Sequence, residues 1–144
     1  MFEFLRRSKV AIFEMPDIGD RWMREVVRHD GRDVDLAVRE LPPGSTVREA
    51  GRFVALIQPE PSISPNTYRA WTDALQRALE AEGKGVLVVV QADTSQITWY
   101  AYASKRETLD EIVYAQRATH PMRWGIQPDA DWAEYEFARK LVRG

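Results

Sequence analysis

The chain contains no cysteine, only two histidines and no long apolar run. The absence of cysteine excludes a disulfide scaffold, a cysteine-containing zinc site and a thiol nucleophile, and it is typical of a reducing compartment. No segment approaches the roughly 18 apolar residues of a membrane-spanning helix. The N-terminal Met1–Arg7 carries Glu3 inside its apolar part and does not have the pattern of a signal peptide. We therefore expect a cytoplasmic protein without a membrane partner.

An excess of charge of one sign is also missing. The 20 Lys and Arg residues are balanced by 22 Asp and Glu residues, which leaves a formal net charge of −2. Such a chain has no overall positive field to attract a polyanion, so its composition disfavours nucleic acid as a partner. A length of 144 residues with 44% hydrophobic residues is enough for one core without metals or disulfides. We predict one domain over residues 1–144.

The patterns that mark catalytic, metal or phosphate sites are absent as well. Neither His29 nor His120 has a second histidine three or four residues away, so no zinc pattern results. Gly83-Lys84-Gly85 precedes an expected strand, whereas a phosphate-binding loop follows a strand and opens a helix. The acids Asp129, Asp131 and Glu134 are explained by helix capping. The sequence therefore predicts no catalytic residue, no metal site and no cofactor.

The N-terminal part, about residues 10–45, is predicted to be an extension built on a β-hairpin. Asp30-Gly31 separates two runs of alternating or β-branched residues, and Gly tolerates the positive φ of a tight primed turn. We place this hairpin at about 23–40. A short helix from Asp20 through Val27 is the alternative, because the spacing of its apolar residues also fits a helical period.

The core is predicted to span about residues 52–142. In chain order we expect a strand at 53–57 with both faces buried, a helix at 65–82, strands at 86–91 and 97–103, a helix over 104–120, a strand at 122–127 and a closing helix. Ser64 is expected to cap the first helix and Gly83 to end it. Ser104 with Glu107 matches a capping box for the second, and Asp129 is expected to cap the closing helix.

This order predicts an α+β fold, namely a ferredoxin-like βαββαβ sandwich with an N-terminal β-hairpin and an extra C-terminal helix. In that sandwich the strand containing Val86–Val90 lies at an edge, where its unpaired backbone would invite aggregation. Either the 23–40 hairpin or a second copy of the chain should cover this edge. We expect a homodimer on this ground.

The strand at 97–103 has large side chains on both of its faces. Trp99 faces one side, whereas Tyr100 and Tyr102 face the other. We expect the closing helix to cover the tyrosine side through apolar residues that include Trp132 and Tyr135. If it lies elsewhere, the tyrosines form an exposed patch and a candidate binding site. Exposed tyrosines on such a sheet would also suit single-stranded RNA, which we keep as a second alternative function.

The chain has five tryptophans, and several of them are candidates for lining one pocket. Trp99, Trp124 and Trp132, together with the nearby Arg123, would give a small-molecule-binding protein or an enzyme with an aromatic pocket. This is the first alternative function. The candidate binding residues on the sequence are therefore Trp99, Tyr100, Tyr102, Arg123, Trp124 and Trp132.

Two segments resemble an uncharacterised bacterial family, catalogued as domain of unknown function 695. They are the aromatic strand Thr98-Trp99-Tyr100-Ala101-Tyr102 and the helix start Pro128-Asp129-Ala130-Asp131-Trp132-Ala133-Glu134-Tyr135. The resemblance spans about residues 22–142, and the chain departs from it in the proline-rich loop at 58–65. The family is similar in architecture to the ribonuclease E inhibitor proteins, which bind an enzyme, and it has no established catalytic residues. The resemblance thus implies a non-enzymatic protein-binding or regulatory domain, whose partner is another protein or a second copy of itself.

Overall fold

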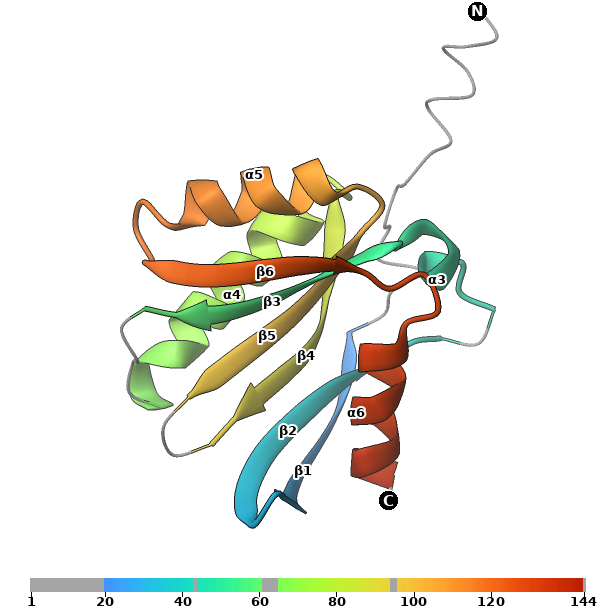
Figure 1. Cartoon of the computed structure of the whole chain (residues 1–144), viewed down its shortest axis with the longest axis vertical. Coiled ribbons are helices and arrows are strands. Elements are labelled where there is room, and N and C mark those ends of the chain that lie inside the picture. The colour runs from blue at the N-terminus through green and yellow to red at the C-terminus, as the bar shows by residue number, and fades with distance from the viewer. Residues whose placement is uncertain (1–19, 43, 61–64, 94–95, 144) are drawn as a thin grey trace, which may run out of the picture.

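The fold is a six-stranded antiparallel sheet with helices on both of its faces (Figure 1). The computed structural model describes residues 20–42, 44–60, 65–93 and 96–143. The elements are β1 (Arg21–His29), β2 (Arg32–Glu40), α3 (Val47–Ala50), β3 (Phe53–Pro59), α4 (Pro65–Glu80), β4 (Gly85–Ala92), β5 (Ile97–Ala103), α5 (Arg106–Gln116), β6 (Met122–Pro128) and α6 (Ala133–Arg143). The strand order is β1-β2-β4-β5-β3-β6. The predicted α+β class is confirmed.

The N-terminal hairpin is present where the sequence placed it. β1 and β2 pair along their whole length, from Arg21 opposite Glu40 to His29 opposite Arg32. Asp30 and Gly31 form the turn with φ angles of 51° and 77°. Positive φ at both central positions is the geometry of a primed turn, whose twist matches the flanking strands. The alternative of a helix from Asp20 through Val27 is therefore wrong.

The Val-rich strand β4 is not an edge, because the hairpin pairs with it. β2 lies antiparallel to β4, with Asp35 opposite Ala92 and Val38 opposite Val89. The sequence offered the hairpin or a second copy of the chain as the cover for this strand. The hairpin provides the cover, so the structure removes the reason for expecting a second copy at that position. β1 and β6 are the outermost strands instead.

A buried ion pair continues the connection between hairpin and core where the β2–β4 pairing ends. Arg39 is fully buried, and its guanidinium donates to both carboxylate oxygens of Glu80 at 2.6 and 3.1 Å. Leu87 of β4 joins the same network. Its N–H donates to Glu80 over 3.0 Å, and its carbonyl accepts from Arg39 over 2.9 Å. The two charges thus satisfy backbone groups of Leu87 in addition to each other.

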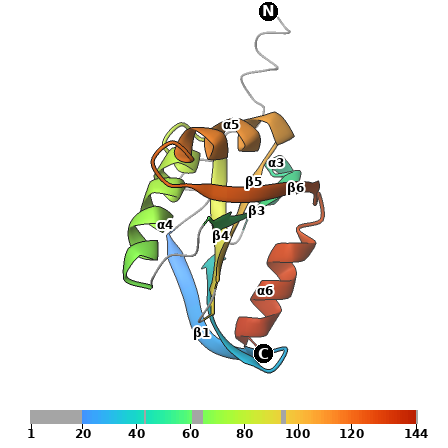
Figure 2. The same ribbon diagram turned by 60° about the vertical axis from the view of Figure 1, so that its left-hand side comes forward.

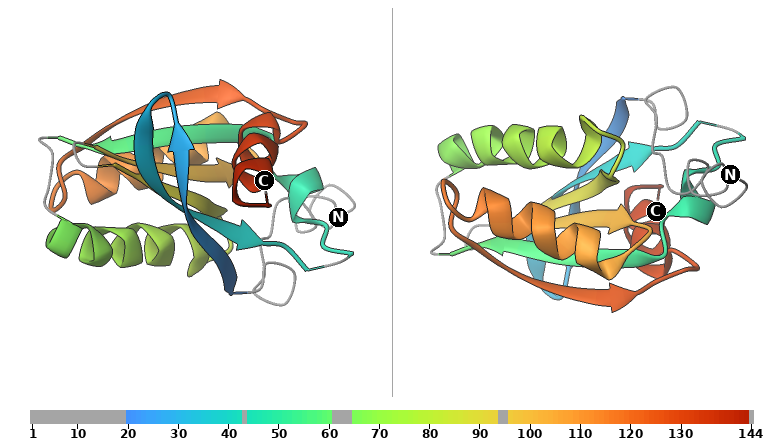
Figure 3. Two further views of the ribbon diagram at one scale, coloured as in Figure 1. Left: turned by 90° about the horizontal axis from the view of Figure 1, so that it is seen from below. Right: turned by 90° about the horizontal axis from the view of Figure 1, so that it is seen from above.

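The two faces of the sheet carry separate cores. Figure 2 shows α4 and α5 on one side of the sheet and α6 on the other, and Figure 3 shows α4 and α5 side by side. Trp99 packs in the α4–α5 core, whereas Tyr102 packs under α6 with Trp132 and Tyr135. The predicted division of the 97–103 strand into two faces is confirmed. The predicted central strand is also confirmed, because β3 pairs with β5 on one side and β6 on the other.

The closing helix α6 is anchored by a group of aromatic and polar contacts at its start. Trp132 has a φ of 58° and stacks on Tyr102, with ring centroids 3.8 Å apart. Its indole N–H donates to the carbonyl of Gly51 at 2.7 Å. The Asp129 carboxylate accepts the N–H groups of Ala133 and of the next residue at 2.9 and 3.1 Å. Asp129 therefore caps α6 as predicted.

Helix ends account for the errors in the predicted elements. The capping box at Ser104 and Glu107 is wrong, because the N-cap of α5 is Lys105 in an extended conformation with no side-chain cap hydrogen bond. Ser104 lies one residue too early for its hydroxyl to cap this helix. α5 also ends at Gln116, before His120. Gly83 stops α4 with a φ of 64°, as expected. The expected cap at Ser64 lies outside the described residues.

The contact between Gly51 and Trp132 predicts a steric effect on stability. A Cβ at position 51 would lie 2.8 Å from Cζ2 of Trp132 and 3.1 Å from Cβ of Tyr102. We expect Gly51→Ala to lower the free energy of unfolding by about 2 kcal/mol, because overpacking forces the rings or the backbone to shift. Gly125→Ala is the matched control, since nothing lies within 4 Å of its Cβ position. Urea unfolding curves in which both variants match the wild type would contradict this packing.

The buried pair makes a second prediction. Glu80→Gln removes the close, buried counterion of Arg39 and one of the acceptors for Arg39 and Leu87, and it leaves the longer 3.7 Å contact with the exposed Asp20. We expect a loss of about 3 kcal/mol in urea unfolding, as is usual when one partner of a buried ion pair is removed. Glu82→Gln is the control, because its ion pair with Lys84 is exposed and should contribute less than about 0.5 kcal/mol. Equal curves for the two variants would show that the pair does not hold the hairpin.

Candidate functional site

The six candidate residues from the sequence separate into buried and surface groups. Trp99 is fully buried on the α4–α5 side, where its indole N–H donates to Thr72 Oγ1 at 2.8 Å. Trp132 is fully buried under the opposite face of the sheet. Trp124 packs on the α5 side, and its N–H donates to Asp110 at 2.8 Å. The structure therefore does not bring the three indoles together into one aromatic pocket.

Tyr102 is a structural residue of the α6 junction. Its hydroxyl donates to Asp129 Oδ2 at 2.6 Å and accepts the backbone N–H of Tyr135 at 3.2 Å. Burial raises the pKa of Tyr102 well above the ordinary range, and the hydrogen bond to Asp129 is the second-largest cause of the increase. The ring lies beneath Trp132 and has no exposed surface. An RNA base therefore has only Tyr100, and not a pair of tyrosines, to stack against.

Tyr100 and Arg123 do come together, on the part of the sheet that α6 leaves uncovered, whereas the Trp124 indole points to the opposite, α5 side. α6 packs mainly against β1, β2 and β4, and its start buries Tyr102 and Val54. The part of the same face that carries Tyr100, Leu56 and Gly125 stays at least partly exposed. A shallow depression of about 480 Å³ lies there. We call its lining the open sheet face: Leu56, Gln58, Thr98, Tyr100, Arg123, Trp124 and Gly125.

The polar groups of the open sheet face are held in place by hydrogen bonds. Gln58 donates to Thr98 Oγ1 at 3.0 Å and accepts from Arg123 Nε at 3.0 Å. The Tyr100 hydroxyl donates to Gln91 at 3.1 Å. Burial raises the pKa of Tyr100, and the negative charge of Glu134 raises it further, so this hydroxyl stays protonated near neutral pH. The surface is therefore ordered before any partner arrives.

An apolar centre completes the open sheet face. Leu56 is half-buried and lies directly opposite Tyr100 on one neighbouring strand and Gly125 on the other. Gly125 has no side chain to fill the space beside Leu56, which keeps the depression open. In the described part of the chain no carboxylate pairs with Arg123. The open sheet face thus presents hydroxyls, amides and one guanidinium around an apolar centre.

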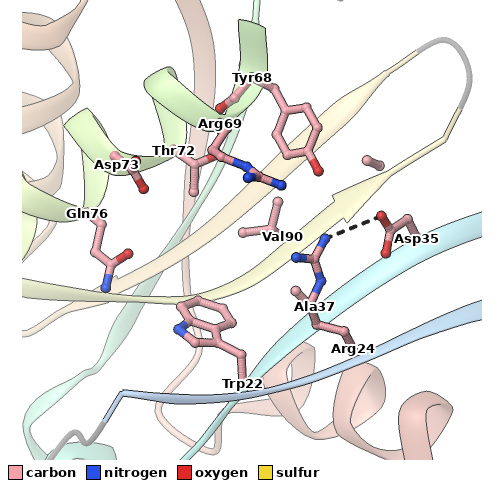
Figure 4. Close-up of a pocket in the computed structure, with 11 residues that line it drawn as sticks. Trp22, Arg24, Asp35, Ala37, Tyr68, Arg69, Thr72, Asp73, Gln76 and Val90 are labelled. Carbon is pink, nitrogen blue, oxygen red and sulfur yellow. Dashed lines mark hydrogen bonds and ion pairs between the residues drawn. The ribbon is translucent and has the colours of Figure 1, made fainter. Parts of the chain in front are cut away.

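A second concave site, which the sequence analysis missed, lies on the opposite face of the sheet. We call it the hairpin cleft, and it encloses about 360 Å³ between α4 and the hairpin strands (Figure 4). Its floor includes Trp22, Arg24, Ala37 and Val90, and its wall on α4 includes Tyr68, Arg69, Thr72 and Asp73. The missed signal is the alternation of Trp22 and Arg24 on one face of the hairpin. It gains meaning only once the hairpin is known to extend the sheet beside α4.

Other kinds of site find no support in the described part of the chain. Among those residues there is no group of three His, Asp or Glu side chains placed to hold a metal ion. None of the helices there is both long and apolar enough to cross a membrane. Searches against protein-family models, curated proteins and solved structures return no match to this chain. The sites must therefore be interpreted from their own geometry.

The different surroundings of the two tyrosines make a prediction. Tyr102→Phe removes an acceptor from the buried N–H of Tyr135 and a donor from Asp129. We expect this variant to lose about 2 kcal/mol of unfolding free energy, because a buried amide is left unsatisfied. Tyr100→Phe removes one half-exposed bond to Gln91 and should cost less than about 1 kcal/mol. Urea unfolding measures both, and a larger loss for Tyr100→Phe would reverse the assigned roles.

Proposed function

We propose that this chain is a non-enzymatic protein-binding domain that docks its partner on the open sheet face. The observation that carries the proposal is the position of α6, which covers β1, β2 and β4 and leaves Leu56 and Tyr100 partly exposed on the remaining strands. An apolar centre with a polar surround is the usual anatomy of a protein interface, and tyrosine and arginine are enriched there. The depression is shallow, which suits contact with a protein surface.

The hydrogen bonds within the open sheet face support binding by a rigid surface. Gln58 holds both Thr98 and Arg123, so their side chains are ordered before contact. A surface that is ordered in advance loses less side-chain entropy when a partner binds. Arg123 is exposed and lacks an acidic partner among the described residues. We expect the partner to present a carboxylate to this guanidinium and an apolar side chain to Leu56.

The topology supports the ferredoxin-like part of the proposal. β3, α4, β4, β5, α5 and β6 follow one another as β-α-β-β-α-β, and these strands pair in the order β4-β5-β3-β6. The first and third strands of the unit are then central, as in a split βαβ sandwich. The hairpin and α6 are additions to that unit. We propose the cytoplasmic, regulatory kind of role that the resemblance to domain of unknown function 695, a family similar in architecture to the ribonuclease E inhibitor proteins, implies.

Site-specific photocrosslinking in cells tests where the partner docks. A photoreactive p-benzoylphenylalanine replaces Gln127, which is exposed on β6 beside the open sheet face. The control position is Tyr114, which is 69% exposed on α5 behind the opposite face of the sheet. We expect a discrete crosslinked product from position 127 and none from position 114. A product of twice the mass of the chain identifies the partner as a second copy, and any other protein product identifies a different partner.

Charge reversal provides the second arm of the experiment. Arg123→Glu should reduce the yield of the product at position 127 at least about fivefold, because it turns an attractive contact with a carboxylate into a repulsive one. Arg117→Glu is the matched control, since Arg117 is exposed just after α5 and away from this surface. The proposal fails if position 127 gives no protein product, gives only RNA, or gives a product that Arg123→Glu leaves unchanged.

A further inference from the structure

We infer that the hairpin cleft binds a small organic anion, namely a carboxylate or phosphate group attached to a compact apolar body. The cleft lies on the face of the sheet opposite the open sheet face, so this inference goes beyond the proposed function and does not depend on it. Two arginines that enter the cleft, Arg24 from β1 and Arg69 from α4, carry the argument. The apolar floor between them sets the size and character of the rest of the ligand.

The two arginines come from different elements and meet over the same strand. Arg24 rises from β1 and Arg69 descends from α4 (Figure 4). Both guanidinium groups, together with the hydroxyl of Tyr68, are directed into the space above Val90. Two like charges directed into one space repel each other unless an anion lies between them. Guanidinium groups with a neighbouring hydroxyl are well suited to carboxylate and phosphate oxygens.

The acids of the cleft leave this anion position open. Asp35 contacts Arg24 at 3.5 Å, but both side chains are about half exposed, so the pair is weak and can exchange. Among the described residues no carboxylate pairs with Arg69. Asp73 lies toward the other end of the cleft beside Gln76 (Figure 4). A bound anion can therefore bridge Arg69 and Arg24 without displacing a strong ion pair.

The floor of the cleft is apolar and firmly supported. Val90 is only 9% exposed and belongs to the main core, with the half-buried Ala37 packed against it. The indole of Trp22 forms the far side of the cleft, and the guanidinium of Arg39 stacks on it at 5.2 Å. On α4, Thr72 is fixed by its hydrogen bond from Trp99 at 2.8 Å. A ligand thus meets a formed apolar surface, which favours a flat hydrocarbon body next to the anionic group.

The size of the cleft selects a small molecule and not a macromolecule. A volume of about 360 Å³ is near the lower end for ligand pockets, which begin at roughly 300 Å³. A bicyclic aromatic acid has the right dimensions and chemistry. We therefore use 2-naphthoate and 2-naphthyl phosphate as probes, with 2-naphthalenemethanol as the neutral compound of matched shape.

Titration of the full chain followed by ¹H–¹⁵N NMR tests the inference. We expect saturable shifts at the indole N–H of Trp22 and at the backbone amides around Arg24 and Arg69, caused by at least one of the two anions. The neutral alcohol should bind about fivefold more weakly, which is the effect expected from partly exposed charge contacts. The naphthoate and phosphate arms identify which anionic group the cleft prefers.

Two variants and a control locate the site. Arg69→Gln should weaken binding of the anion to the affinity of the neutral alcohol. Arg77→Gln should leave the affinity unchanged, because Arg77 is exposed and lies two turns further along α4. Ala37→Leu fills the floor of the cleft and should weaken the binding of the anion and of the alcohol to the same extent. The inference is overturned if the alcohol binds as tightly as both anions or if Arg69→Gln changes nothing. Shifts that map outside the cleft, or no saturation at millimolar probe, overturn it as well.

Discussion

The pairing of β2 with β4, secured by the buried Arg39–Glu80 ion pair, is the interaction on which the rest of the structure depends. The ladder itself joins only Asp35–Val38 to Val89–Ala92. Beyond this ladder, the Arg39 and Glu80 side chains form the hydrogen bonds to the backbone carbonyl and N–H of Leu87. A buried ion pair is not by itself a large source of stability, but removing one of its partners is costly. The hairpin therefore becomes part of the main sheet and is not a loose arm.

Both candidate sites follow from this extension of the sheet. The hairpin gives α6 a surface to pack on, and α6 consequently lies mainly over β1, β2 and β4 while the part of β5, β3 and β6 around Leu56 and Tyr100 remains partly exposed. On the other face, the hairpin strands extend past α4, and the angle between them becomes the hairpin cleft (Figure 4). Without the hairpin, the Val-rich strand would be a bare edge and neither site would have its present shape.

Local signals in the sequence predicted the elements well, because each depended on a few neighbouring residues. The Asp30-Gly31 turn, the stop at Gly83 and the alternation along 97–103 all have such short-range causes. The candidate sites were harder to predict, because they depend on which helix covers which part of the sheet. Tyr100 and Tyr102 look equivalent in the sequence, yet the position of α6 buries one and leaves the other half exposed. The hairpin cleft joins residues 22–37 to residues 68–76 and 90–92, and no local pattern records that proximity.

The alternation of β4 keeps the two sites separate. Val90 and Ala92 face the hairpin cleft, whereas Gln91 between them faces the other way and holds Tyr100 at the open sheet face. Neighbouring residues of one strand thus serve opposite faces, as strand geometry requires. The side chains under Val90 are close-packed, and a close-packed core moves little when a small ligand binds on one side. Because β4 separates them in this way, loss of binding at Arg69 and loss of binding at Arg123 report on different surfaces. One result can fail while the other stands.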